Sequence, residues 1–191
     1  MLVLFNKPFN VLTQFSGDDP SRTLAGFGLP PRIYAAGRLD ADSEGLLVLT
    51  DDGSLQHRLA NPRHKEAKVY FAQVEGTPAD DALARLCDGL DLGDFVAQPC
   101  EASVVTEPDW LWPRDPPIRF RKTVPTSWLR IVLREGKNRQ VRRMTAKVGL
   151  PTLRLVRESI GDWRLGPLQP GQWCEVAMPQ PGTSTTRRFA R

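Results

Sequence analysis

The sequence is poor in cysteine and histidine, and each shortage excludes a class of protein. Its three cysteines, Cys87, Cys100 and Cys174, are odd in number and widely spaced, which favours reduced, buried thiols over a disulfide framework. Its two histidines, His57 and His64, have no cysteine near them, so their spacing is not that of a zinc site. We therefore expect no metal site.

The chain also lacks the segments that direct a protein into or across a membrane. No stretch approaches the ~18 consecutive apolar residues of a transmembrane helix. The apolar start, residues 1–5, is too short for the core of a signal peptide. We expect a cytoplasmic protein with no membrane partner. Nucleophile-elbow, phosphate-loop and dinucleotide-binding motifs are absent too, which excludes the enzyme classes that depend on them.

Positive charge is present and is concentrated in one segment. The whole chain has a net charge of +4, but residues 114–143 contain ten basic and two acidic residues and carry +8, which leaves −4 for the remainder. A basic stripe on a mildly acidic body is typical of proteins that bind a phosphate polymer, so we expect a nucleic-acid partner. The alternative is a charged face that serves solubility alone.

The hydrophobic pattern predicts many strands joined by few, short helices. Because strands and helices do not alternate regularly, a doubly wound parallel sheet is disfavoured and the fold class is α+β. We expect one catalytic domain over residues 1–182 and a basic, flexible tail over residues 183–191. Strands are expected at 2–5, 33–36, 47–50, 68–75, 101–106, 128–133, 153–160 and 173–178, and helices at 54–59, 78–87 and 139–148.

The most informative stretch runs from Gly37 to Leu46, where two glycines bracket three acids and an arginine. An apolar run follows at once and reads as a buried strand, which puts the acids on a loop at a strand edge. Loops held by a rigid scaffold often carry catalytic residues. A carboxyl group beside Arg38 could stay ionised, because a nearby positive charge favours the carboxylate. The alternative is a solvated turn with three surface acids.

Two basic segments are candidate RNA contacts. Residues 110–122 interleave tryptophans, prolines and arginines. They could stack on unpaired bases and neutralise phosphates, or the tryptophans could pin a long loop onto the core; both possibilities stay open. The expected helix at 139–148 places three arginines beside an apolar face, and its N-terminus adds positive potential. The candidate RNA-binding residues here are Lys137, Arg139 and Arg143.

Four stretches of the sequence, taken together, resemble a known family. They are Asn6-Lys7-Pro8, the Gly37–Thr50 stretch, Lys68-Val69-Tyr70, and Glu135 to Met144. Their order and composition resemble the RsuA-type pseudouridine synthases of ribosomal RNA, from Leu2 to about Val176. The resemblance implies the pseudouridine synthase fold, a long, mainly antiparallel mixed sheet in two lobes with few flanking helices and a central active cleft. Many relatives carry a small RNA-binding domain before the Asn-Lys-Pro motif. We expect this chain to bind RNA with its catalytic domain alone.

The resemblance also implies roles for individual residues. Asp40 falls on the essential catalytic aspartate, whose carboxylate either attacks the ribose or assists loss of the base. Tyr70 falls on the tyrosine that stacks on the target base, and Val141 on an apolar wall of the base pocket. Arg142 falls on the basic residue that pairs with the aspartate. Arg38 falls on the position that fills the gap left by the flipped nucleotide. No cofactor and no metal are implied.

The function that follows is isomerisation of a specific uridine in 23S ribosomal RNA to pseudouridine, by base flipping, glycosidic cleavage, rotation and carbon–carbon rejoining. We expect a monomer. The main alternative is a non-catalytic ribosomal-RNA-binding assembly factor, which would be indifferent to Asp40→Asn. A second alternative is a glycosidase, in which Asp42 and Glu44 would belong to an acid pair; Asp42 and Glu44 are otherwise expected to shape the loop.

Overall fold

The computed structural model describes residues 1–60, 66–118 and 123–178. Its strands are β1 (Leu2–Lys7), β2 (Tyr34–Ala35), β3 (Glu44–Thr50), β4 (Lys68–Glu75), β5 (Glu101–Val105), β6 (Thr126–Leu133), β7 (Thr152–Ile160), β8 (Trp163–Arg164) and β9 (Trp173–Val176). Its helices are α1 (Gly53–Ala60), α2 (Asp80–Asp88) and α3 (Gln140–Lys147), with short 3₁₀ turns η1 (Pro20–Arg22) and η2 (Leu24–Phe27). The predicted tail and the last four residues of the 110–122 segment lie outside the described residues.

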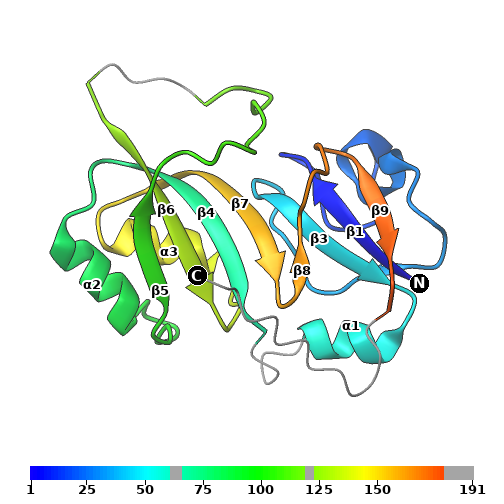
Figure 1. The fold of residues 1–191 in the computed structure, drawn as a ribbon, viewed down its shortest axis with the longest axis horizontal. Helices are drawn as coiled ribbons and strands as arrows, with labels where there is room; N and C mark the ends of the chain where they lie inside the picture. The colour runs from blue at the N-terminus through cyan, green and yellow to red at the C-terminus, as the bar shows by residue number, and fades with distance from the viewer. Residues whose placement is uncertain (61–65, 119–122, 179–191) are drawn as a thin grey trace, which may run out of the picture.

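The strands form one sheet in the order β5-β6-β4-β7-β3-β1-β9, with β2 and β8 attached to β3 and β7 (Figure 1). The ladders between neighbours are antiparallel except that of β3 with β7, which is parallel. That ladder consists of two register pairs, Glu44 with Val156 and Gly45 with Arg157. The sheet is therefore divided into two lobes that meet at this short junction. The predicted α+β fold with a mainly antiparallel mixed sheet is confirmed.

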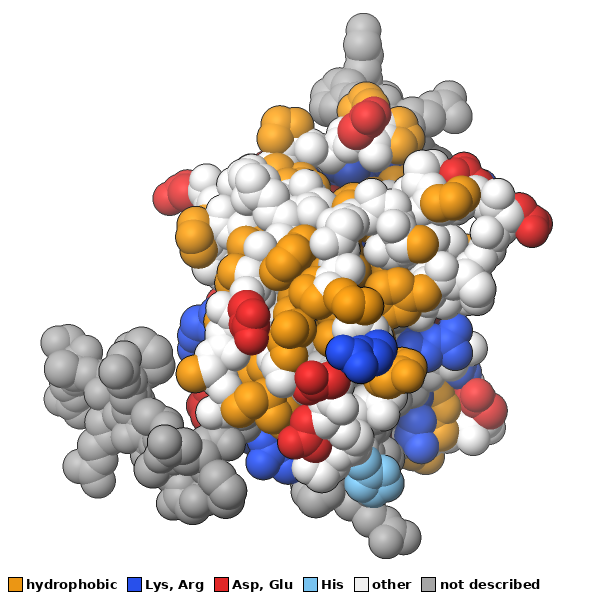
Figure 2. Space-filling model, turned by 90° about the vertical axis from the view of Figure 1, so that its right-hand side faces the viewer, with side chains coloured by type: hydrophobic (Ala, Val, Ile, Leu, Met, Phe, Trp, Pro, Cys, Tyr) orange, Lys and Arg blue, Asp and Glu red, His pale blue; other side chains and the backbone are white. Residues whose placement is uncertain are grey.

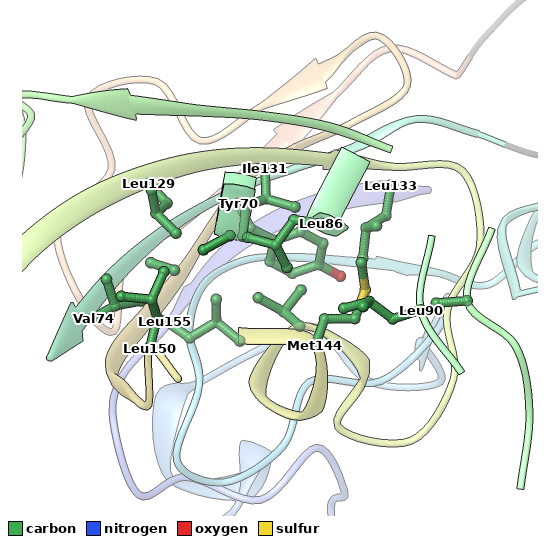
Figure 3. Packing of buried hydrophobic residues seen from close by; sticks show 14 of the residues in the cluster. Tyr70, Val74, Leu86, Leu90, Leu129, Ile131, Leu133, Met144, Leu150 and Leu155 are labelled. Carbon is green, nitrogen blue, oxygen red and sulfur yellow. The ribbon is translucent and has the colours of Figure 1, made fainter. Parts of the chain in front are cut away.

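Each lobe has its own hydrophobic core. In the first lobe, α2 and α3 cover one face of β4, β6 and β7 and enclose a single cluster (Figure 3). In the second lobe both faces of β3 are covered: Leu46 and Val48 pack on one side, Leu47 and Leu49 on the other. A strand covered on both faces is apolar without alternation. This explains why the sequence showed a continuous run at 47–50.

Most predicted elements are found within two residues of their expected ends. The first strand is longer than predicted. It continues through Lys7, because Asn6 donates its backbone N–H to Gln172 and Lys7 still pairs with Gly45 of β3. Strand β8 was not predicted from the sequence; its two residues pair with the end of β7. Among the described residues, no helix has the length and apolarity to cross a membrane.

Candidate active site

Residues 37–43 form a loop that enters β3 at the junction of the two lobes. The loop closes on itself where Ser43 donates its backbone N–H to the Asp40 carbonyl at 3.0 Å. Thr13 anchors its start, since the Thr13 hydroxyl donates to the Leu39 carbonyl at 2.7 Å and accepts from the Leu39 N–H at 3.2 Å. Asn10 anchors its centre by donating its backbone N–H to Ala41 at 2.7 Å. Asn10 and Thr13 of the N-terminal segment thus hold the backbone of the loop in place.

The buried side chain of Lys7 completes this anchor. Its ammonium group donates to the carbonyls of Val11 at 2.7 Å, Pro8 at 2.9 Å and Ala41 at 3.3 Å. These contacts tie the Asn6-Lys7-Pro8 motif to the middle of the loop. Sequence reasoning quoted this motif but gave Lys7 no role, because no local pattern shows which carbonyls a buried lysine will meet.

The environment of Lys7 also changes its acidity. Burial lowers the pKa of Lys7 from 10.5 to about 7, and the negative charges of Glu44 and Asp42 oppose that shift only in part. Removing an ammonium group from water disfavours its charged form, which explains the direction. A lysine that titrates near neutrality therefore lies directly beneath the loop that bears Asp40.

Asp40 stands near the outer end of the loop with its side chain 37% exposed. Within the described part of the chain, its carboxylate accepts no hydrogen bond, and its nearest cation is Arg139, with Nη1 of Arg139 3.6 Å from Oδ2. Arg38, two residues earlier, is exposed, as a residue that contacts RNA should be. The structure thus presents a carboxylate that is accessible, close to a guanidinium, and free to meet a substrate.

Arg142 does not pair with Asp40, and this corrects the sequence-based expectation. Its Nη2 donates to the backbone carbonyl of Asp42 at 2.6 Å, and its Nε lies 3.4 Å from the Asp42 carboxylate. Its Nη1 donates to the Thr152 carbonyl at 3.3 Å. Arg142 lies a turn further along α3 than Arg139, so it reaches under the loop instead of its outer end. Arg142 therefore joins the loop to β7.

Asp42 is the acceptor that both arginines share. Arg139 binds its carboxylate with two hydrogen bonds, of 2.8 and 3.0 Å. Partial burial alone would disfavour the charged form, but the Arg139 hydrogen bonds and the charges of Arg142 and Arg139 hold the pKa of Asp42 below its usual value. Sequence analysis expected a loop-shaping acid here, and the structure confirms that role.

The start of α3 is built to point Arg139 at the loop. Arg139 has φ of 51°, a left-handed backbone conformation that is uncommon for residues other than glycine. The turn before it is held by Gln140, whose side-chain oxygen accepts the Lys137 N–H at 3.0 Å and whose amide donates to the buried Glu135 carboxylate. A fixed turn and a left-handed residue together direct the guanidinium away from the helix and toward Asp42.

Leu39 of the loop packs into the hydrophobic core of the first lobe. Leu39, Tyr70 and Val141 belong to one buried cluster, together with Met144 from α3 (Figure 3). The structure therefore brings together the three segments that the sequence singled out. Tyr70 is 9% exposed and Val141 is 4% exposed. Tyr70 is thus a largely buried strand aromatic in this structure, and stacking on a base stays a prediction.

The other two candidate RNA-binding residues lie around Phe95. The Arg143 guanidinium lies 4.9 Å from the Phe95 ring centroid and the Lys137 ammonium 5.9 Å from it. Arg143 also forms an ion pair with Asp94 and donates to the Leu92 carbonyl at 2.9 Å. Part of the positive charge of α3 is therefore already neutralised by an acid of the 90–97 loop.

Glu44 is a buried structural acid. It opens β3 and accepts two hydrogen bonds from Arg154, at 2.8 and 2.9 Å, and one from the indole N–H of Trp112 at 2.9 Å. Its side chain is 2% exposed. Because Glu44 is fully engaged and Asp42 is held by arginines, these residues do not form the free acid pair that a glycosidase requires.

These contacts also bear on the two possibilities for the 110–122 segment. Trp112 is packed into the core of the second lobe, and Trp110 rests against Phe71 of the first lobe with ring centroids 5.2 Å apart. Arg114 lies 4.4 Å from the centre of the Phe9 ring. Over its described part, the segment is pinned across both lobes, as the second possibility stated.

A separate hollow of about 330 Å³ lies elsewhere, lined by Phe15, Leu24, Ala25, Gly28 and residues 29–34. It contains no predicted site residue, and Arg32 is its one charged lining residue in the described chain. Its described lining residues include no carboxylate, histidine, cysteine or lysine. Figure 2 views the side that carries β9, where hydrophobic side chains gather at the centre of the face. In the described ranges, no group of three or more His, Cys, Asp or Glu residues could hold a metal ion.

Comparison with known proteins agrees with this geometry. Residues 1–147 match the family described as RNA pseudouridylate synthase. A "Ribosomal large subunit pseudouridine synthase E" of Xanthomonas campestris pv. campestris is 62% identical over 175 residues, which cover 91% of this chain and 94% of that protein. The protein of the same name in Xanthomonas axonopodis pv. citri is 60% identical over 190 residues, covering 98% and 100%.

A solved structure has the same fold. The crystal structure of a pseudouridylate synthase superposes with a TM-score of 0.75 at 25% sequence identity, covering 92% of this chain and 70% of that chain. The matched residues 1–147 include the Asp40 loop, the Tyr70 strand and the start of α3. Because the family match covers residues 1–147 and relatives of the same family are about 60% identical over nearly the whole chain, the chain belongs to the RNA pseudouridylate synthase family, the isomerases that convert uridine in RNA to pseudouridine.

Proposed function

We propose that this isomerase modifies one specific uridine of 23S ribosomal RNA and that Asp40 is its catalytic residue. The observation that carries the proposal is the Asp40 carboxylate, exposed at the lobe junction with no hydrogen bond from any described residue. The ribosomal target is supported by the names of the two Xanthomonas relatives. We further propose that residues 1–182 act as one catalytic unit, as a monomer in the cytoplasm.

The reaction requires a uracil base that the enzyme can reach and a carboxylate close to its ribose. A uridine in structured RNA must be flipped out of its stack, at a cost of a few kcal/mol. Phosphate contacts from Lys137, Arg139 and Arg143 offset that cost, and the exposed Arg38 occupies the space left in the RNA. The flipped base enters above Val141 and stacks on Tyr70.

The reaction then exchanges one bond to the ribose for another. The bond between C1′ of the ribose and N1 of uracil breaks while the Asp40 carboxylate attacks the sugar or assists departure of the base. Uracil rotates and a bond forms between C1′ and C5, and any ester bond between Asp40 and C1′ breaks in the same step, which frees the carboxylate. The C5 proton then leaves while N1 regains a proton. All heavy atoms of uracil stay on the RNA, and the proton lost from C5 is matched by one gained at N1, so the step is an isomerisation and needs no metal or cofactor.

The experiment is a comparison of Asp40→Asn with the wild type in cells that lack their own copy of the enzyme. Pseudouridine in 23S RNA is mapped by reverse transcription, and tritium release from RNA labelled at C5 of uridine is measured with purified protein. We expect wild type to modify a single uridine and Asp40→Asn to modify none while still binding RNA. Asp88→Asn, an exposed acid on α2, is the matched control.

Each alternative predicts a different result. A non-catalytic assembly factor would leave ribosome assembly unchanged on Asp40→Asn and would release no tritium. A glycosidase would release free uracil into solution. Full modification of 23S RNA by Asp40→Asn would overturn the assignment of Asp40.

A further inference from the structure

Arg157 of β7 is a buried cation whose hydrogen bonds, within the described chain, go to backbone carbonyls alone. The residue is 3% exposed. Its Nε donates to the Leu46 carbonyl at 2.9 Å and its Nη1 to the Arg38 carbonyl at 3.4 Å. Its Nη2 is buried and has no hydrogen-bond partner among the described residues. Such a group costs free energy, because burial removes water from a charge that the protein satisfies only in part.

Arg154, on the same strand, is a buried arginine that is satisfied. It is 5% exposed, and its Nε and Nη2 donate to the two carboxylate oxygens of Glu44 at 2.8 and 2.9 Å. Structural pairing accounts for Arg154. It does not account for Arg157, since an apolar side chain there would avoid the cost of burying a charge. A local feature that lowers stability is expected where function requires it.

The sheet register places Arg157 beside the candidate active site. Tyr70 pairs with Arg157 across β4 and β7, and directly opposite side chains of an antiparallel ladder lie on the same face. The register shifts at this point, because Val69 pairs with Ser159, and such irregularities redirect side chains. On its other side Arg157 pairs with Gly45 of β3. Arg157 therefore lies where the two lobes meet, on the face that carries Tyr70.

The two carbonyls that Arg157 binds lie on opposite sides of Asp40 in the chain. Arg38 precedes Asp40 in the loop, and Leu46 follows the loop as part of β3. The guanidinium reaches one carbonyl with Nη1 and the other with Nε. Because the guanidinium is planar and rigid, these contacts fix the spacing between the two ends of the segment that carries Asp40.

We propose that Arg157 is a positioning residue that holds the two ends of the Asp40 loop together and so sets the distance between the Asp40 carboxylate and the ribose. The inference rests on the proposed function, because it assumes that Asp40 reacts with the substrate. Arg157 acts through the backbone of the loop and touches no substrate. A displacement of about 1 Å in a reacting group costs about 100-fold in rate, so the effect falls on the chemical step.

The test compares Arg157→Lys and Arg157→Met with Arg154→Lys as the matched control. The single-turnover rate at saturating RNA, the RNA dissociation constant and the melting temperature are measured for each protein. We expect both Arg157 variants to lower the rate about 10- to 100-fold and to change the dissociation constant less than about threefold. Lysine keeps the charge, but one ammonium nitrogen does not replace both Nε and Nη1.

Arg157→Met separates positioning from stability. Methionine brings no charge into the interior, so this variant should melt at or above the temperature of Arg157→Lys while it reacts as slowly. The control should melt below wild type, because lysine does not reproduce both hydrogen bonds of Arg154 to Glu44. Its rate should nevertheless stay within about threefold of wild type.

Amide hydrogen exchange provides a measurement that does not depend on catalysis. Peptides that cover residues 37–46 should exchange faster in both Arg157 variants than in wild type, because the two ends of the loop are no longer held together. Peptides from β6 should exchange at the wild-type rate, since that strand does not contact the loop ends.

Three outcomes would overturn the proposal. They are a wild-type rate in either Arg157 variant, a loss of rate that only follows the melting temperature across the three variants, and unchanged exchange in residues 37–46. Failure of the proposed function looks different. Asp40→Asn would then keep the wild-type rate, while faster exchange of the loop in the Arg157 variants would still be observed.

Discussion

Nη2 of Arg142 lies 2.6 Å from the carbonyl oxygen of Asp42, a residue 100 positions earlier in the chain. Nη1 of the same side chain contacts the Thr152 carbonyl. The Arg142 side chain, which is 13% exposed, thus joins the loop of residues 37–43, α3 and β7. Because guanidinium groups form a planar fork of donors, no other residue type reproduces these contacts. Arg142 therefore links the loop of residues 37–43 to α3 and β7 of the first lobe.

Replacing Arg142 by alanine should lower both stability and activity. Loss of a charge-assisted hydrogen bond to a half-buried carbonyl predicts a decrease of about 2 kcal/mol in the free energy of unfolding. The turnover rate should fall at least about tenfold, because the loop that bears Asp40 loses its anchor. Urea unfolding and tritium release measure the two effects. The matched control is Arg130→Ala, whose exposed ion pair with Glu101 spans 3.9 Å; it should stay within about 0.5 kcal/mol of wild type. Wild-type activity in Arg142→Ala would contradict the anchor role.

Gly45 should not tolerate a side chain. It has φ of 99°, and a Cβ there would lie 2.3 Å from the Arg157 carbonyl oxygen, inside the short ladder that joins the lobes. We expect Gly45→Ala to lose at least about 3 kcal/mol, from backbone strain and steric overlap together. Gly53→Ala is the control, because no atom lies within 4 Å of a Cβ at Gly53; it should change stability by less than about 1 kcal/mol. Equal melting temperatures of the two variants would show that the junction can adapt.

Trp112 should matter through its indole N–H as well as its packing. In Trp112→Phe the buried Glu44 loses the 2.9 Å hydrogen bond from the indole but keeps those from Arg154. A partly unsatisfied buried carboxylate predicts a cost of about 1–3 kcal/mol. The same change at Trp110, a residue that is 40% exposed, should cost less. Chemical unfolding of the two variants makes the comparison, and a larger loss for Trp110→Phe would refute it.

Lys7 should make stability depend on pH above neutrality. Burial lowers the pKa of Lys7 to about 7 in the folded state, against 10.5 as the ordinary value. Between these values the unfolded chain binds more protons than the folded one, so the free energy of unfolding should rise with pH, by up to ~1.4 kcal/mol per pH unit. Below pH 7 the ammonium is charged in both states and its burial cost is present in full.

Lys7→Met tests this, because methionine has a similar length and no charge. Denaturant unfolding from pH 6 to pH 9 should show wild type gaining stability relative to Lys7→Met above pH 7. Parallel curves for the two proteins would mean that Lys7 keeps its proton in the folded state, held by its three carbonyl acceptors.

Local sequence was sufficient to predict most of the elements and to single out the candidate residues. A composition rich in valine and aromatic residues located β4 from Lys68 to Glu75, with both ends as predicted. Motif order identified the Asp40 loop, Tyr70 and the start of α3, because these stretches carry their signals in neighbouring residues. The same reasoning treated Asp42 and Glu44 as loop-shaping acids. Asp42 does lie on the loop, in an ion pair with Arg139. The prediction was wrong for Glu44, which lies in β3 and pairs with the buried Arg154, because the strand begins three residues earlier than the apolar run indicated.

The residues alone were enough to predict which segments would meet near Asp40 and which type of sheet would support them. Which arginine meets which acid depended on the packing of the folded chain. Arg139 and Arg142 lie about one turn apart, and the acids Asp40 and Asp42 are two residues apart on a loop about a hundred positions away. The pairing depends on a left-handed residue at the start of α3 and on differences of less than 1 Å between competing contacts. No local pattern encodes such distances, because they are set by how the two lobes and α3 pack together.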